Sequence, residues 1–280
     1  MNNINTISSS ELPSKLQTIP DPPKKLWYRG QFPDVRRLHV AIVGSRKPSA
    51  YGRQVTEQIS RGLAERGAVI VSGMAHGVDG IAHQACIRGN GTTIAVLPGG
   101  IDSPYPASHR GLAEDIVDSG GLLMSEDEPG LPAMQFRCLK RNRLVIGMAD
   151  LLIVTEANLR GGSMGTATLA LEQGKDVYAV PGNITSPLSG GPNALIASGA
   201  HPITYIEQFV DELLPKPKAR KNQAYTVAEK TILELLEGGI SDGDELQQKS
   251  GLATAMYLQT ITMLEITGAV KPLGNNRWGL

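Results

Sequence analysis

This chain of 280 residues has only two cysteines, no formal net charge and few long apolar runs. The two cysteines, Cys86 and Cys138, fit neither a metal-ligand spacing nor a disulfide framework, which predicts a reducing compartment and no metal site. Basic and acidic residues number 27 each. Since no global basic field recruits nucleic acid, any anion must be bound locally.

Targeting and cofactor signals are also missing. No apolar run approaches the roughly 20 residues of a membrane span, and the polar N-terminus lacks a signal-peptide pattern. We therefore expect a soluble, cytoplasmic protein with no membrane partner. Neither a Walker loop nor a GxGxxG fingerprint occurs, so we expect no nucleotide cofactor and no small-molecule substrate.

Short apolar runs alternate with helix-length segments through most of the chain. The predicted strands are His39–Val43, Ala68–Ser72, Thr92–Leu97, Gly121–Ser125, Asp150–Thr155 and Asp176–Val180. The predicted helices are Gly52–Arg66, Val78–Arg88, Arg110–Ser119, Met164–Gln173, Asn193–Ser198 and Ile206–Leu214. This alternation predicts an α/β fold, with a Rossmann-like, mostly parallel sheet and helices on both faces.

The two ends of the chain differ from this pattern. Residues 1–38 are polar and then proline-rich, which predicts a disordered start (1–10) and an extended lead-in packed on the main domain, 39–214. Residues 215–222 read PKPKARKN and predict a basic linker. Residues 223–280 resemble a small winged-helix domain of three helices and a hairpin.

The C-terminal segment carries seven acidic and four basic residues from Gln223 to Leu280, a net charge of 4 − 7 = −3. This charge disfavours phosphate contact. The predicted third helix, Ala255–Ile266, also contains no lysine or arginine. We therefore favour a protein-contact or regulatory role for this domain over binding of duplex DNA.

A Gly-Ser-Arg turn follows the first predicted strand. Gly44 lets the backbone approach a ligand closely, Ser45 offers a hydroxyl donor, and Arg46 offers a charge-assisted fork to a phosphate. The alternative is that Gly44 only makes the turn and Arg46 forms a structural ion pair.

A second glycine-rich turn, SGMAHG, follows the next strand. Gly73 and Gly77 would present backbone N–H groups at a helix start, with Asp79 as the cap. His76 would contact a phosphate or a base, although a lone histidine is often structural. We interpret His83, on the following helix, as a packing or capping residue.

The run RCLKRNR, residues 137–143, holds four positive charges and no acidic residue. Lys140, Arg141 and Arg143 are predicted to bind a DNA backbone, with a steep salt dependence. Asn142 would read a base edge or hold a loop, and Phe136 would stack on a base. The alternative is a solvated basic helix start.

A third glycine-rich loop, around Gly162 and Ser163, follows the strand that ends near Glu156 and is suited to one phosphate. Pro181-Gly182-Asn183 follows the next strand. Since these turns all follow parallel strands, we expect at least four loops to converge at one edge of the sheet.

The segment from about Leu12 to Leu214 resembles the DprA/Smf family, the DNA-processing proteins of bacterial transformation. The motifs that carry the resemblance include VAIVGSRKPSAYG, VSGMAHGVDGIAH, TIAVLPGGIDSPYP, KRNRLVIGMAD and GGPNALIASGA. The resemblance implies a non-enzymatic protein that binds single-stranded DNA, loads the RecA recombinase onto it and forms a homodimer. This chain departs from the family at His76, where arginine is usual, and at Cys138-Leu139, where Phe-Pro is usual.

An enzymatic alternative comes from GGSMGTATLALE, residues 161–172, which resembles the loop of nucleoside-monophosphate phosphoribohydrolases. Glu156 and Glu172 would then act as acid or base near a ribose. One inserted residue and a missing second glutamate beside Thr166 weaken this alternative. A transcription regulator that uses the winged helix is a third, less favoured hypothesis.

Overall fold

The computed structural model describes residues 4–215, 225–266 and 269–279. They belong to two compact units, one up to Pro215 and one from Lys216 onward. The predicted basic linker, 215–222, lies outside the described residues except for Pro215. None of the described helices is both long and apolar enough to cross a membrane.

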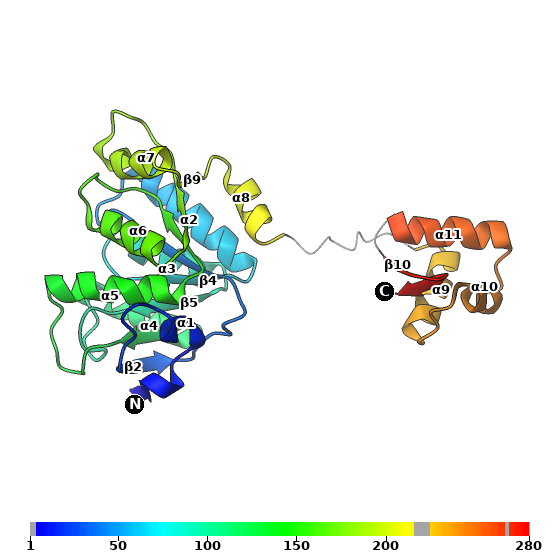
Figure 1. Cartoon of the computed structure of the whole chain (residues 1–280), viewed down its shortest axis with the longest axis horizontal. Coiled ribbons are helices and arrows are strands. Elements are labelled where there is room, and N and C mark those ends of the chain that lie inside the picture. The colour runs from blue at the N-terminus through cyan, green and yellow to red at the C-terminus, as the bar shows by residue number, and fades with distance from the viewer. Residues whose placement is uncertain (1–3, 216–224, 267–268, 280) are drawn as a thin grey trace. The chain divides into compact units, whose positions relative to one another are not determined.

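A sheet forms the centre of the first unit (Figure 1). It has nine strands in the order β1-β2-β6-β5-β4-β3-β7-β8-β9. All neighbours from β6 to β9 pair in parallel, whereas β2 pairs antiparallel with both β6 and β1. The strands are β1 (Asn5–Ser8), β2 (Lys25–Gly30), β3 (His39–Val43), β4 (Val69–Ser72), β5 (Thr92–Val96), β6 (Leu122–Ser125), β7 (Leu151–Val154), β8 (Asp176–Ala179) and β9 (His201–Pro202). The predicted mostly parallel α/β fold is confirmed.

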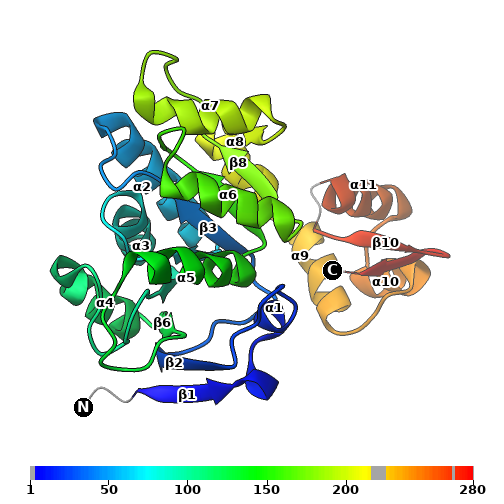
Figure 2. The ribbon, with the colours of Figure 1, turned by 60° about the vertical axis from the view of Figure 1, so that its left-hand side comes forward.

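Helices cover both faces of this sheet, because its central strands are apolar on both sides. All five residues of β3 are buried. Ala41 and Val43 pack toward α1, α5 and α6, while Val40 and Ile42 pack toward α2, α3 and α8. Figure 2 shows α5 and α6 side by side over one face. The helices of this unit are α1 (Ser14–Gln17), α2 (Ala50–Glu65), α3 (Val78–Arg88), α4 (Arg110–Asp118), α5 (Gln135–Met148), α6 (Gly162–Glu172), α7 (Gly190–Ala197) and α8 (Ile206–Leu213).

The N-terminal segment differs from its prediction. Asn5–Ser8 is a strand rather than part of a disordered start, and Lys25–Gly30 extends the sheet by pairing with β6. Leu16, between these strands, is buried in the same core as Leu144 of α5. The prolines that flank β2 suggested a loop, and only its pairing with a strand almost 100 residues later makes this segment a strand.

The second unit consists of α9 (Val227–Glu237), α10 (Gly243–Ser250), α11 (Thr254–Ile266) and a hairpin of β10 (Lys271–Gly274) and β11 (Arg277–Gly279). This is the element order that the sequence predicts for a winged helix. Thr226 and Glu229 form a capping box at the start of α9, and Asp242 caps α10. Ile232, Leu246 and Ile261 bring the three helices together in a core of their own.

Candidate nucleic-acid interface

A cleft of about 730 Å³ opens at the carboxyl ends of the parallel strands in the first unit. Its lining comes from the loops after β3, β4, β5 and β7, and from the start of α5. It includes Gly44, Ser45, Arg46, Lys47, Ala75, Asp79, Tyr105, Met134, Gln135, Cys138, Leu139, Arg141, Asn142, Asn158, Gly161, Gly162, Ser163 and Thr166. The loops after β3, β4 and β7 therefore meet as expected. The predicted Pro181-Gly182-Asn183 loop is not part of this lining, and the loop after β5 contributes instead.

The Gly-Ser-Arg turn occupies one wall of the cleft. A β-carbon on Gly44 would lie 2.7 Å from the carbonyl oxygen of Glu156, so this turn requires glycine. The Ser45 amide donates to that same carbonyl at 2.6 Å, which leaves only the Ser45 hydroxyl to reach a ligand. Arg46 is exposed and forms no ion pair with the residues that the structure describes. Of the two interpretations of Arg46, a free ligand-binding cation fits this position better.

The two glycines of the second turn lie in close contact with other parts of the protein. Gly77, at φ +77°, lies under the first turn, where a β-carbon would be 2.3 Å from the Ser45 carbonyl oxygen. A β-carbon on Gly73 would lie 2.3 Å from Nη1 of Arg141. Gly77 therefore requires glycine, because its neighbours are backbone atoms, whereas a β-carbon at Gly73 would have to displace the end of the Arg141 side chain.

The Asp79 carboxylate lies within hydrogen-bond reach of the N–H groups of Gly73, at 3.2 Å, and Ala75, at 3.4 Å. These contacts hold the turn that precedes α3, whose N-cap residue is Gly77 and which has no side-chain cap, so the predicted capping role of Asp79 is wrong. They also correct the prediction for Gly73, because its N–H is used inside the protein instead of being offered to a phosphate. Burial raises the pKa of Asp79, and the charge of Arg141 opposes that rise.

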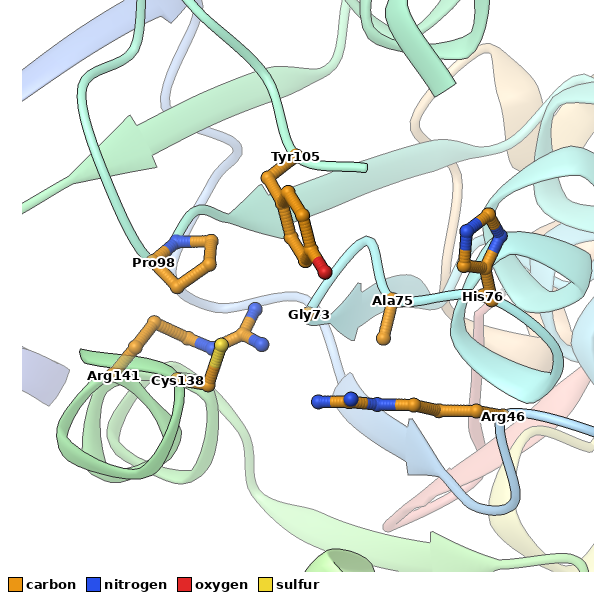
Figure 3. Close-up of a pocket in the computed structure, with 8 residues that line it drawn as sticks. All are labelled: Arg46, Gly73, Ala75, His76, Pro98, Tyr105, Cys138 and Arg141. Carbon is orange, nitrogen blue, oxygen red and sulfur yellow. The ribbon is translucent and has the colours of Figure 1, made fainter. Parts of the chain in front are cut away.

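Arg141 is the buried cation of the site, with 8% of its surface exposed. Its Nη1 donates to the carbonyl oxygen of Val96 at the end of β5. Burial lowers the pKa of Arg141, and the negative charge of Asp79 opposes this effect. The guanidinium borders a small side pocket of about 20 Å³, which it shares with Arg46, His76, Tyr105 and Cys138 (Figure 3).

The basic run 137–143 does not form one cationic patch. Arg137 pairs with Asp127, Lys140 with Glu126 at 3.1 Å, and Arg143 with Glu126 at 2.7 Å. Arg143 also pairs with Asp21. Lys140 and Arg143 are therefore ion-paired and lie outside the cleft lining, which argues against the prediction that they bind a DNA backbone there.

Helical geometry explains this split. One face of α5 and its N-cap residue lines the cleft. Its residues, 134/135, 138 and 141/142, are spaced by three or four along the chain. Residues 137, 140 and 143 lie on a different stripe. Phe136 is 58% exposed, and the guanidinium of Arg137 lies 5.3 Å from its ring centre. Of the residues predicted to bind DNA here, the cleft therefore receives Arg141 and Asn142 but not the ring of Phe136.

The start of α6 forms the opposite wall. Gly161 is the N-cap residue and supplies no side-chain cap, so the first-turn N–H groups at Gly162 and Ser163 face the cleft with the positive end of the helix dipole. Asn142 Nδ2 donates to Thr166 Oγ1 at 3.0 Å and ties α5 to α6. Of its two predicted roles, Asn142 therefore holds the local structure.

Two rings border the side pocket (Figure 3). His76 packs edge-to-face on His109, with ring centres 5.0 Å apart, and His109 donates through Nδ1 to the carbonyl oxygen of Met74. Tyr105 is 47% exposed and lines both the side pocket and the cleft. Sequence reasoning missed Tyr105, although it lies in the loop after a predicted strand, where the convergence argument applies equally.

His83 lies under this site, and its burial should make the stability of the fold sensitive to acid. It is fully buried, its Nδ1 lies 2.7 Å from Thr93 Oγ1, and desolvation is the main cause that lowers its pKa from 6.5 to about 3. Because the folded protein resists protonation of His83, the stability present above pH 6.5 is lost as the pH falls toward 3. We expect His83 to lower the free energy of unfolding by about 2 kcal/mol between pH 7 and pH 5.

Urea unfolding of wild-type protein and His83→Gln at both pH values measures this effect. The loss between pH 7 and pH 5 is expected to be smaller in the variant by that amount. Asp79 works in the opposite direction, because an acid with a raised pKa gains stability as the pH falls, but it is present in both proteins. Equal losses in the two proteins would contradict the assignment.

The carboxylates of the enzymatic alternative lie apart. Glu156 is buried and accepts hydrogen bonds from the Ser49 amide and hydroxyl at 2.8 and 2.6 Å, at the start of α2. Glu172 is exposed at the last residue of α6, whose first residue borders the cleft. The eleven residues of α6 place Glu172 about 15 Å from the end of the helix that borders the cleft. This geometry does not bring the two glutamates to one ribose.

Residues 3–214 match the family described as DNA recombination-mediator protein A. The chain is 39% identical to the DNA processing protein DprA of Bacillus subtilis over 213 residues, which cover 75% of this chain and 71% of the relative. It is 34% identical to Protein Smf of Escherichia coli over 267 residues, 91% of this chain and 71% of the relative.

A solved structure of DNA processing protein A from Helicobacter pylori, described for its single-stranded DNA binding mode, has the same fold. The TM-score is 0.70 at 35% identity, and the match covers 76% of this chain and 98% of that one.

Proposed function

This chain belongs to the family of DNA recombination-mediator protein A, and from that premise we propose that its cleft binds single-stranded DNA. The observation that carries the proposal is the meeting of Arg46, Arg141 and the uncapped start of α6 around one cleft. The H. pylori relative, whose structure is described for single-stranded DNA binding, supports the same ligand.

The physical argument starts from the balance of charge. With no net charge on the whole chain, a strand must be held by cations that are locally free. Arg46 meets this condition, and Arg141 has a fixed guanidinium beside it. The first-turn N–H groups of α6 add donors for a phosphate oxygen. Single strands suit this site because their unstacked bases can enter a cleft beside the phosphates.

Fluorescence anisotropy with labelled oligo-dT and a matched duplex, over a salt series, tests the proposal. We expect preferential binding of the single strand, with affinity that falls steeply as salt rises, because phosphate contacts release counterions. Equal affinity for both ligands, or no binding at low salt, would contradict the proposed function.

Tyr105 is expected to stack on a base of the bound strand. It is half-exposed at the junction of the cleft and the side pocket, near the position where Cys138 replaces the family's usual phenylalanine. We expect Tyr105→Ala to weaken oligo-dT binding by about 10-fold, because aromatic stacking contributes about 1–3 kcal/mol per base. The salt slope should not change, since no charge is lost.

Tyr105→Phe is the matched control, because it keeps the ring and removes only the hydroxyl. Its affinity should stay within about twofold of wild type if stacking is the role. An equal loss in both variants would assign the effect to the hydroxyl group instead.

The resemblance further implies roles in natural transformation, in loading RecA and in a homodimer, and we propose these as the wider function. Two linked cleft copies would gain affinity for one strand through their effective concentration. Light scattering of the full chain, with and without oligo-dT, tests the homodimer. Co-sedimentation of RecA with the DNA complex tests the loading partner. The acidic second unit is the proposed protein-contact module.

A further inference from the structure

We propose that Cys138 is a modification site, at which an anionic low-molecular-weight disulfide of the glutathione class forms a mixed disulfide that closes the cleft. The loss of DNA binding rests on the proposed function of the cleft. The modification itself depends only on the thiol and its surroundings.

The first observation is the position of the thiol. Cys138 is half-buried and lines both the cleft and the side pocket. It lies on the face of α5 that also carries Arg141, and Figure 3 shows its sulfur at the same opening as that guanidinium. A group attached to this sulfur would therefore project into the space that a DNA strand needs.

The second, independent observation is a buried cation beside it. Arg141 is more than nine-tenths buried, and its Nε has no hydrogen-bond partner in the part of the chain that the structure describes. Arg46, which is exposed and forms no ion pair with the described residues, reaches the same pocket. Two guanidiniums at one small pocket favour an anionic ligand. Glutathione disulfide supplies carboxylates for these cations and a disulfide for the thiol.

The chain itself provides selectivity between its two thiols. Cys86 is fully buried, its Sγ–H donates to the carbonyl oxygen of Thr92 at 3.3 Å, and burial raises its pKa to about 12. Because exchange needs an accessible thiolate, Cys86 is unreactive in the folded protein. One modification per chain is therefore expected.

The exchange is balanced without a further oxidant. The Cys138 thiol loses its proton to solvent, and the thiolate attacks one sulfur of glutathione disulfide. The reagent's S–S bond breaks as the new bond between Cys138 Sγ and glutathione forms, and the other half leaves as glutathione thiolate. Cys138 is oxidised and one half of the reagent is reduced. An added thiol reverses the reaction by the same path.

The test treats the full chain with glutathione disulfide and measures both the adduct and oligo-dT binding. Mass spectrometry of intact protein and of peptides should find one glutathionyl group, on Cys138. Anisotropy should show at least about a tenfold loss of affinity, because the adduct covers Arg46 and Arg141, and dithiothreitol should restore binding. An uncharged reagent, hydroxyethyl disulfide, should react about severalfold more slowly if the cations attract the anion.

Two variants complete the design. Cys138→Ser, whatever its starting affinity, should bind oligo-dT equally before and after treatment. Cys86→Ala should keep the full response. Absence of an adduct on Cys138 would overturn the proposal, as would an adduct that leaves affinity unchanged. If the untreated protein binds no single strand, the proposed function fails, while the adduct measurement still decides whether Cys138 is the modification site.

Discussion

Replacement of Gly77 by alanine is expected to destabilise the first unit by about 2–5 kcal/mol. Gly77 has φ +77°, which an L-residue adopts with strain. A β-carbon there would also lie 2.3 Å from the Ser45 carbonyl oxygen and 2.6 Å from the Arg46 carbonyl carbon. Since these atoms are backbone, the whole first turn must move to admit the methyl group. Urea unfolding at pH 7 measures the loss.

The same substitution should also weaken DNA binding. The turn that would be displaced carries Arg46, and the Val78 amide that fixes it, at 3.1 Å from the Ser45 carbonyl, would lose its partner. At a temperature where the variant remains folded, we expect a loss of about tenfold or more in oligo-dT affinity.

Gly120→Ala is the matched control, because Gly120 has φ +80° and open space where its β-carbon would lie. Gly120→Ala should lower the free energy of unfolding by only about 1–2 kcal/mol, the strain of the left-handed conformation. It should not change DNA affinity. If the two variants lost equal stability, close packing between the two turns would not explain the need for glycine at position 77.

Arg46→Ala is expected to weaken single-strand binding by about 10- to 100-fold, since a charge-assisted hydrogen bond contributes about 1.5–3 kcal/mol. The slope of log affinity against log salt should fall by about one, the value for one lost phosphate contact. Anisotropy over a salt series measures both quantities. Stability should change little, because the side chain is exposed and has no ion-pair partner within the described residues.

Lys140→Ala is the control for Arg46→Ala, because it removes the same charge from another exposed side chain. Lys140 pairs with Glu126 and lies outside the cleft lining. Its removal should change DNA affinity by less than about twofold. A large loss in Lys140→Ala with little effect in Arg46→Ala would favour the basic run as the binding patch and contradict the geometry.

The sequence by itself determined the core of the architecture. Apolar runs such as His39–Val43 and Leu151–Val154 can be buried on both faces only inside a parallel sheet with helices on either side. That topology places the turns that follow parallel strands at one edge of the sheet. Gly44 and Arg46 were therefore predicted to share a site with Gly162, although more than 100 residues separate the two loops. Local pattern sufficed here because strand period and connection handedness leave few alternatives.

The tertiary structure decided which charges are free and which N–H groups are used. Sequence shows Lys140, Arg141 and Arg143 as equivalent cations, yet the fold supplies Glu126 and Asp21 to two of them and directs the third into the cleft. It also gives the Gly73 N–H to Asp79. Neither outcome was predictable, because electrostatic pairing and hydrogen bonding depend on distances of a few ångströms between segments that no local pattern relates.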